Sequence, residues 1–266
     1  MKNSSQHINY DEALEFAKLL ALDARKITMK YYRTNLQYIT KNDTSPVTVA
    51  DQQINQLAID RVKERFPNHG ILGEEQSWQP DREILWVCDP IDGTIAFSMG
   101  EPIFMFSIAL VKNGIPIVAV AGDLASGGIF WATKGGGAYL NDSSIHVSSR
   151  SMNEAWLAFP ANLRRLYGNQ PMYQRIAKEA YQAHVVHGSV NKGVLLAQGL
   201  SDGTIWLGSC HPWDVAAVKL IVEEAGGKFT DLSGGEQRFD DELVDGAIMS
   251  NGIIHDDIVD IIKNKQ

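Results

Sequence analysis

The stretch that decides the fold is Ile84-Leu-Trp-Val-Cys-Asp-Pro-Ile-Asp-Gly-Thr94. It begins with a short, continuous apolar run, which is typical of a buried strand. We expect this strand to end at Asp89, a turn at Pro90, and a new helix after Asp92-Gly93-Thr94. Two carboxylates would then lie together at the carboxyl end of a strand, where α/β folds usually place their binding sites.

The start of the expected helix is suited to an anion. The backbone N–H groups of Gly93 and Thr94 would point outward there and could receive a phosphate group. Two carboxylates beside that position would repel a phosphate unless a cation lay between them. Mg²⁺ is the expected cation, because it is hard, prefers oxygen ligands and bridges carboxylates to phosphates. An aspartyl-phosphate mechanism of the haloacid dehalogenase type is excluded, since Pro90 stands where its nucleophile would be needed.

The surrounding chain alternates between helices and strands. Apolar residues recur at three- and four-residue steps over 13–31 and predict a long helix capped by Asn9. Similar patterns predict further helices at 54–62, 172–183, 190–198, 215–225 and 253–262. Apolar runs predict strands at 104–111, 115–121, 128–133, 137–140, 156–159, 204–207, 227–230 and 247–250. A polar stretch near residue 150 divides the chain into an N-terminal half, residues 1–150, and a C-terminal half, residues 151–266.

Composition limits the classes of function. The chain has 266 residues, 44% of them hydrophobic, and a formal net charge of −8, which argues against nucleic-acid and anionic-membrane partners. It has two cysteines, Cys88 and Cys210, so no disulfide framework is expected and a reducing cytoplasm is favoured. Residues 1–11 lack the apolar core of a signal peptide, and the apolar run 115–121 is too short to span a membrane. The sequence therefore predicts a cytoplasmic protein with a substantial core.

Two further acidic motifs fit a metal site. Gly73-Glu74-Glu75 follows a short apolar pair, and Trp213-Asp214 opens a helix that ends at Ala225-Gly226-Gly227. Together with the stretch from Asp89 to Thr94, these motifs resemble the signature set of the inositol monophosphatase family, which comprises Mg²⁺-dependent, lithium-sensitive phosphatases. The resemblance extends over nearly the whole chain. It implies a layered α/β/α/β/α sandwich of the inositol monophosphatase and fructose-1,6-bisphosphatase type, and a homodimer.

The resemblance also implies roles for individual residues, with two or three Mg²⁺ ions per site. Glu74, Asp89 and the Ile91 carbonyl would hold one ion, while Asp89, Asp92 and Asp214 would hold a second. Glu74 would also support a third, weaker ion and counts among the catalytic residues. Thr94 and Asp51 would orient the attacking water. Lys41 and Glu75 are possible accessory residues near the metals.

Substrate contacts are expected from both halves of the chain. Gly188-Ser189-Val190 resembles the family loop that touches substrate hydroxyls, and Asp92, Gly93, Thr94 and Asp214 would also face the substrate. Inositol-specific relatives carry a glutamate about seven residues before the Trp-Asp aspartate. Here that stretch is Trp206-Leu207-Gly208, which weakens the case for inositol because polyol recognition relies on such acceptors.

Several substrates remain open. The stretches Asn251 to Asp256 and Asp43 to Thr48 resemble the histidinol-phosphate phosphatase branch of the family. The family also includes nucleotide 3′-phosphatases and sugar bisphosphatases. We predict a phosphate monoester hydrolase acting on a small phosphorylated metabolite such as inositol 1-phosphate, with histidinol phosphate as the alternative.

Each candidate residue also has a purely structural interpretation. Asp51 could form a helix-capping pair with Thr48, and Asp214 could complement the dipole of its helix. Glu75 could be a solvated carboxylate and Lys41 an exposed lysine. The histidines at 184, 187 and 211 lack partners at zinc spacing and are interpreted as structural.

A function of another class is a non-catalytic protein that uses the same fold to bind a partner. The set of mutually repelling acids argues against it, because a purely binding role gives no reason to keep them.

Overall fold

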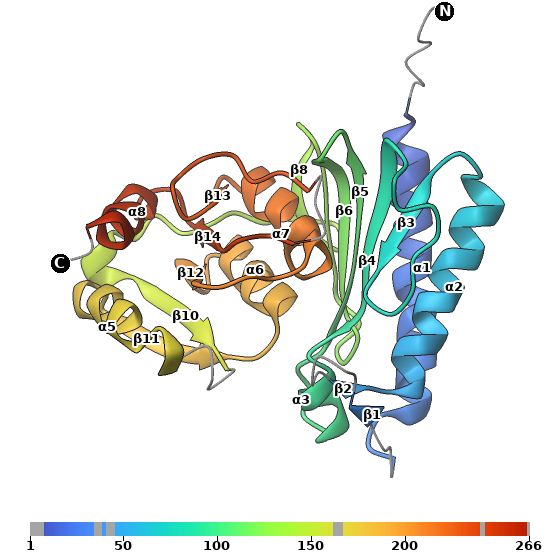
Figure 1. Ribbon diagram of the computed structural model, residues 1–266, viewed down its shortest axis with the longest axis horizontal. Helices are drawn as coiled ribbons and strands as arrows, with labels where there is room; N and C mark the ends of the chain where they lie inside the picture. The colour runs from blue at the N-terminus through green and yellow to red at the C-terminus, as the bar shows by residue number, and fades with distance from the viewer. Residues whose placement is uncertain (1–7, 35–38, 41–45, 162–166, 240–242, 265–266) are drawn as a thin grey trace, which may run out of the picture.

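The protein is described here from a computed structural model that covers residues 8–34, 39–40, 46–161, 167–239 and 243–264. In these ranges, helices and sheets stack as five alternating layers, with two helices outermost on each side and two more between the sheets (Figure 1). The expected α/β/α/β/α sandwich is therefore confirmed. None of the described helices is both long enough and apolar enough to cross a bilayer.

The larger sheet belongs to the first half of the chain. Over the described residues it has seven strands in chain order, β3 to β9, with β3 and β4 parallel and all later neighbours antiparallel. The strands are β3 (Gly70–Gly73), β4 (Ile84–Asp92), β5 (Met105–Lys112), β6 (Ile115–Asp123), β7 (Ile129–Thr133), β8 (Gly137–Leu140) and β9 (Ser143–Ser144). Helices α1 (Tyr10–Tyr31) and α2 (Val49–Arg65) cover its outer face, and the short strands β1 (Ile39–Thr40) and β2 (Pro46–Val47) precede α2.

The smaller sheet belongs to the second half. Its described strands run in the order β11-β10-β12-β14-β13, which places β11 at an edge. Their bounds are β10 (Trp156–Pro160), β11 (Gln182–Val186), β12 (Gly203–Trp206), β13 (Lys228–Thr230) and β14 (Ala247–Ser250). Helices α6 (Ser189–Ala197) and α7 (Pro212–Glu224) lie between the sheets, and α5 (Gln170–Glu179) and α8 (His255–Lys263) cover the outer face.

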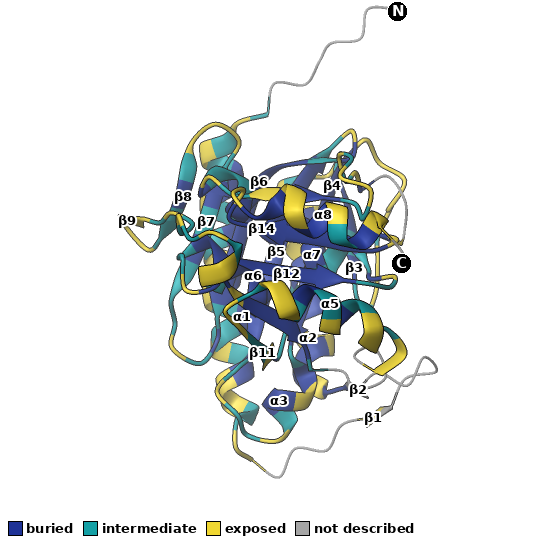
Figure 2. Cartoon of the chain, turned by 90° about the vertical axis from the view of Figure 1, so that its left-hand side faces the viewer, coloured by how far each residue is buried: buried dark blue, intermediate teal, exposed yellow. Residues whose placement is uncertain are grey.

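Burial follows from these layers. All nine residues of β4 are buried, because helices cover both faces of its sheet. Helix α7 is apolar on nearly all sides, as expected for a helix that contacts a sheet on either side. The outer helices α5 and α8 instead expose one face, which Figure 2 shows as the yellow segments. The middle layer is thus the most enclosed part of the molecule, and the acidic motifs lie beside it.

Two predicted boundaries were wrong. The predicted helix 172–183 ends at Glu179, and residues 182–186 form β11 instead, paired in parallel with β10. Helical periodicity carries through this segment, but Val185 and Val186 are β-branched and favour the strand that β10 completes. His184 consequently lies within β11. Strand β4 does not end at Asp89 but continues to Asp92.

Candidate functional site

A bulge in β4 brings two acids to the same side of the sheet. Side chains three residues apart on a regular strand point to opposite faces. Here Asp89 pairs with Ser107 and Asp92 pairs with Met105, so β4 has one more residue than β5 between these two pairs. This extra residue shifts the alternation of side chains by one position, so that Asp89 and Asp92 point to the same face of the sheet. Pro90, which has no N–H to donate, is tolerated at such a bulge. The bulge is therefore what lets Asp89 and Asp92 converge.

A third acid comes from the middle layer. Asp214 lies in the first turn of α7, where the His211 N–H donates to its Oδ2 at 2.8 Å. One carboxylate oxygen from each of Asp89, Asp92 and Asp214 lies within 4.8 Å of the others. We call these three residues the acidic cluster. The acidic cluster thus brings together residues of two of the three acidic motifs found in the sequence, and their role as metal ligands stays a prediction.

Glu74 lies next to the acidic cluster. It follows β3, and its N–H donates to the Cys88 carbonyl at 3.2 Å, which places it beside Asp89 on the neighbouring strand. Glu75 is half-buried, and its N–H donates to the Asn55 side chain at 3.3 Å. Lys41 lies outside the described residues.

The electrostatics of the acidic cluster favour a cation. Burial raises the pKa of Asp89 well above its usual value, and the charges of Glu74, Asp92 and Asp214 raise it further. Burial also raises the pKa of Asp92, to about 6. Asp89 Oδ1 is buried and has no hydrogen-bond donor among the described residues. Buried, unpaired carboxylates are costly unless a partner compensates them. A hard divalent cation would fit this oxygen-only donor set, and Mg²⁺ is the ion that commonly does so.

Asp92 has a second set of contacts, in the other half of the chain. Its carboxylate accepts from the backbone N–H groups of Ser189 (2.8 Å), Val190 (2.9 Å) and Asn191 (3.3 Å), at the start of α6. Gly188 precedes them with a φ of +80°, and a Cβ there would lie 2.5 Å from Asp92 Oδ2. Within the predicted substrate loop, the N–H groups of Ser189 and Val190 are thus engaged by Asp92, and contact of this loop with a substrate stays a prediction.

Asp51 and Thr94 form a buried pair beside the cluster. The Thr94 hydroxyl lies 3.3 Å from Asp51 Oδ1 and 3.0 Å from the Ile91 carbonyl oxygen. Asp51 Oδ2 also accepts from the Thr48 N–H at 2.8 Å and forms a capping box with it. The structural and the functional interpretation of Asp51 are therefore compatible. Burial is the main cause that raises the pKa of Asp51, to about 6.

The helix expected after Asp92 exists but is short. Helix α3 (Thr94–Ser98) begins at the predicted residue, and its N-cap Gly93 has a φ of +94°. A Cβ on Gly93 would lie 2.8 Å from the Ile103 carbonyl oxygen, so the turn requires glycine. Its role in phosphate binding stays a prediction.

The histidine side chains add no ligand to the acidic cluster, although the His211 backbone N–H donates to Asp214. None of the three singled out in the sequence supplies a ligand atom to it. The His211 ring stacks on Trp213 at 4.3 Å, and the His187 carbonyl accepts from the Asn191 side chain.

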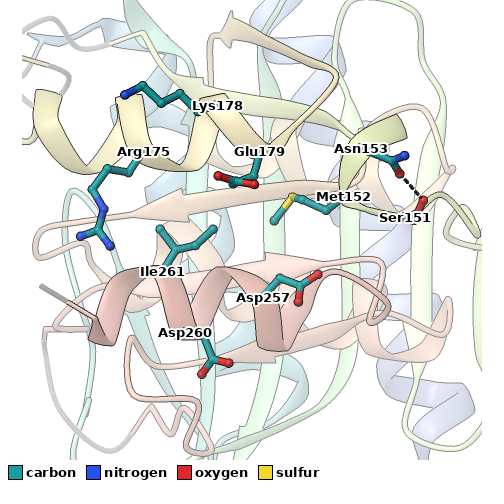
Figure 3. A pocket seen from close by; sticks show the side chains of 9 residues that line it. All are labelled: Ser151, Met152, Asn153, Arg175, Lys178, Glu179, Asp257, Asp260 and Ile261. Carbon is teal, nitrogen blue, oxygen red and sulfur yellow. Dashed lines mark hydrogen bonds between the residues drawn. The ribbon is translucent and has the colours of Figure 1, made fainter. Parts of the chain in front are cut away.

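A surface hollow of about 690 Å³ lies elsewhere, on the outer layer between α5 and α8 (Figure 3). Arg175 and Lys178 of α5 and Asp257 and Asp260 of α8 contribute to its rim. It contains none of the acidic motifs, so it is not the site that the sequence predicts.

One residue near the cluster was missed by the sequence analysis. Lys192 of α6 is only 4% exposed, and its Nζ lies 5.0 Å from the centre of the Trp206 ring. Its positive charge lowers the pKa of Asp92. The available signal was a single charged residue inside the otherwise uncharged run from Val190 to Ala197.

These features define a class of protein: a five-layered α/β/α/β/α sandwich with a buried carboxylate site suited to divalent cations where its two halves meet. Comparison with known proteins identifies the class. The chain belongs to the inositol monophosphatase family, whose family model matches residues 9–266.

Individual relatives carry several different names. A Thermotoga maritima protein named fructose-1,6-bisphosphatase/inositol-1-monophosphatase is 32% identical, covering 81% of this chain and 82% of its own. A histidinol-phosphatase of Chlorobaculum parvum is 32% identical over 94% and 96% of the two chains. A Xylella fastidiosa protein named Nus factor SuhB is 34% identical over 78% and 77%. The solved structure of an inositol monophosphatase from Anabaena superposes with a TM-score of 0.84 at 27% identity, covering 96% and 97%.

Proposed function

We propose that this protein is a Mg²⁺-dependent phosphate monoester hydrolase that acts on a small phosphorylated alcohol. The observation that carries the proposal is the convergence of Asp89, Asp92 and Asp214 within 4.8 Å, beside Glu74 and the Asp51–Thr94 pair. Membership of the inositol monophosphatase family supports it. Two or three ions per site would be held by the acidic cluster, Glu74 and the Ile91 carbonyl.

The residues of the chain would divide the chemistry between them. Divalent cations, when bound, supply Lewis-acid stabilisation of the phosphoryl group and of the departing oxygen. Thr94 would accept a hydrogen bond from the attacking water and donate one through its own hydroxyl to Asp51 Oδ1. These two hydrogen bonds would fix the direction of attack. Asp51 is the buried carboxylate that can take up the proton lost by this water. No covalent enzyme intermediate is needed, because Pro90 occupies the position where an aspartyl nucleophile would stand.

The substrate is proposed only as a class. Inositol 1-phosphate is one candidate, consistent with the T. maritima relative. Histidinol phosphate is the second, favoured by the C. parvum relative, which aligns over 94% of this chain. The stretch Trp206-Leu207-Gly208 stands where inositol-specific relatives are expected to have a glutamate, so its side chains supply no carboxylate acceptor for a polyol hydroxyl.

Phosphate release from a substrate panel tests the proposal. The panel contains inositol 1-phosphate, histidinol phosphate, glycerol 2-phosphate, fructose 1,6-bisphosphate and 3′-phosphoadenosine 5′-phosphate, each with Mg²⁺, with EDTA and with Mg²⁺ plus Li⁺. We expect Mg²⁺-dependent turnover that Li⁺ inhibits. Activity that persists after exhaustive EDTA treatment would contradict the metal-dependent mechanism.

A binding role is the alternative from another class. The X. fastidiosa relative is named as a Nus factor, which is consistent with a protein of this family that has a partner. Cation binding without turnover on the entire panel would favour this alternative.

A homodimer and a cytoplasmic location belong to the same proposal. The edge strand β11 and its neighbours expose Trp156, Tyr181 and Val185, which a second copy could cover. Both cysteines are free thiols, consistent with a reducing compartment. Light scattering coupled to size-exclusion chromatography would test the dimer, and a molar mass equal to that of one chain would refute it.

A further inference from the structure

Lys192 is a buried cation next to a buried group of acids. It belongs to the first turn of α6, immediately after the three residues whose N–H groups bind Asp92. Side chains of helical residues lean toward the N-terminus of their helix, which for Lys192 is the end that Asp92 holds. Its Nζ lies 5.0 Å from the Trp206 ring centre, and only 4% of the residue is exposed.

Packing alone does not account for a lysine at this position. Its neighbours Val190, Val194 and Leu196 on the same helix are buried and apolar, and Trp206 is 3% exposed. An unbranched apolar side chain would fill this space without the cost of removing an ammonium group from water. The charge itself is therefore the property that needs an explanation, and the nearby excess of carboxylates supplies one.

The position of Lys192 also limits what it can do. With Trp206 beside it and 4% exposure, it does not face a substrate that arrives from solvent. It continues the turn of α6 whose backbone N–H groups hold Asp92, so Asp92 is the carboxylate on which it can act. This makes it a positioning residue rather than a catalytic one.

We propose that Lys192 is a built-in positive charge that offsets part of the negative charge of the acidic cluster and thereby weakens its affinity for divalent cations. The inference rests on the proposed function, because it concerns the same site. It follows from Coulomb's law, since a fixed cation beside a metal site repels the incoming ion and competes with it for Asp92. The site would then exchange its cations and respond to their concentration instead of holding them permanently.

The test compares neutral and charged replacements of one side chain. Lys192→Met removes the charge and keeps an unbranched side chain, whereas Lys192→Arg keeps the charge and serves as the matched control. Mn²⁺ binding to the substrate-free protein is measured at pH 8 by the loss of the free-ion electron paramagnetic resonance signal. We expect the Mn²⁺ dissociation constant of Lys192→Met to fall at least about tenfold, which corresponds to about 1.4 kcal/mol. Lys192→Arg should stay within about threefold of the wild type.

A kinetic measurement separates this role from a general packing role. The Mg²⁺ concentration that gives half-maximal activity should fall in Lys192→Met, while the KM for substrate at saturating Mg²⁺ stays unchanged. If Lys192→Met does not fold, Lys192→Gln, which is polar and also uncharged, provides the same comparison. Unchanged or weaker Mn²⁺ binding in a folded neutral variant would overturn the inference. A wild-type protein that binds no Mn²⁺ would instead overturn the proposed function.

Discussion

Replacing Asp89 by asparagine should make the cation-free protein more stable and the enzyme inactive. Asp89 is 2% exposed, and the pKa of its carboxyl is raised by burial and by the charges of Glu74, Asp92 and Asp214. Asparagine has nearly the same shape but no charge, and its NH₂ group can donate to the neighbouring carboxylates. The substitution therefore removes repulsion without opening a cavity.

The size of the effect follows from the geometry. Two carboxylate charges within 4.8 Å repel each other by at least about 3.5 kcal/mol at an effective dielectric constant of about 20. Proton uptake and relaxation in the wild type reduce the difference, so we expect a net gain of about 1–3 kcal/mol in EDTA. At roughly 2–4 °C per kcal/mol for a chain of this size, the Tm should rise by about 2–12 °C.

The pH dependence provides a second measure of the same repulsion. Asp89 and Asp92 have raised pKa values in the folded chain, so the folded state binds more protons than the unfolded state above about pH 4. Their contribution to stability is present at low pH and is lost as the pH rises through the folded pKa values, which for Asp92 is about 6. In EDTA, Asp89→Asn should therefore gain most over the wild type at pH 7.5 and least at pH 5.

Thermal melts with EDTA and with Mg²⁺, together with phosphate release, form the assay. Mg²⁺ at one hundred times its dissociation constant should stabilise the wild type by about 2.7 kcal/mol and should not stabilise Asp89→Asn. Activity should fall at least 100-fold, beyond the roughly 10–100-fold typical of groups that only support a metal ligand. The exposed Asp81→Asn is the control and should change neither property. A variant that is less stable than the wild type in EDTA, or that Mg²⁺ still stabilises, would refute the reasoning.

Three further predictions concern other parts of the structure. Thr94→Val, which removes the hydroxyl beside Asp51, should lower kcat by about 10²-fold or more and leave the Mg²⁺-induced rise in Tm intact; normal turnover would contradict the assigned role. Gly188→Ala should cost about 1–3 kcal/mol in urea unfolding, because its Cβ would lie 2.5 Å from Asp92 Oδ2 at a φ of +80°; a silent substitution would be inconsistent with this contact. Burial lowers the pKa of His255 to about 4, so the unfolded state binds more protons between about pH 4 and 6.5. The stability that this residue contributes is present above about pH 6.5 and should fall by about 2 kcal/mol by pH 5. Between about pH 6.5 and pH 5, His255→Gln should lose less stability than the wild type. Equal losses would exclude protonation of His255 as the cause.

The convergence of Asp89, Asp92 and Asp214 was predictable from the places of their motifs along the chain. The acids at 74, 89, 92 and 214 were identified in the sequence as carboxylates at the ends of strands and the starts of helices. Such positions converge in α/β folds regardless of detailed packing. The helix cap at Asn9 was also predictable, because capping depends on local hydrogen bonds. The Asn9 side chain accepts a hydrogen bond from the Glu12 N–H as expected.

What the sequence did not reveal depends on tertiary partners. Strand β11 exists because β10 offers it a parallel edge, and no local pattern carries that information. The bulge between Asp89 and Asp92 depends on the pairing of β4 with β5, so the sequence suggested a strand end there instead. Lys192 resembled an ordinary helix residue until α6 and β12 were seen to enclose it.

The carboxylate of Asp92 also connects the two halves of the molecule. Asp92 is the last residue of β4 in the larger sheet, yet its carboxylate accepts hydrogen bonds from the first turn of α6 in the second half of the chain. Any replacement of Asp92 that changes the charge of the site therefore also weakens these hydrogen bonds between the two halves. The proposed chemistry and the contact between the two halves thus depend on one side chain, so differences in substrate would have to arise from other residues near the acidic cluster.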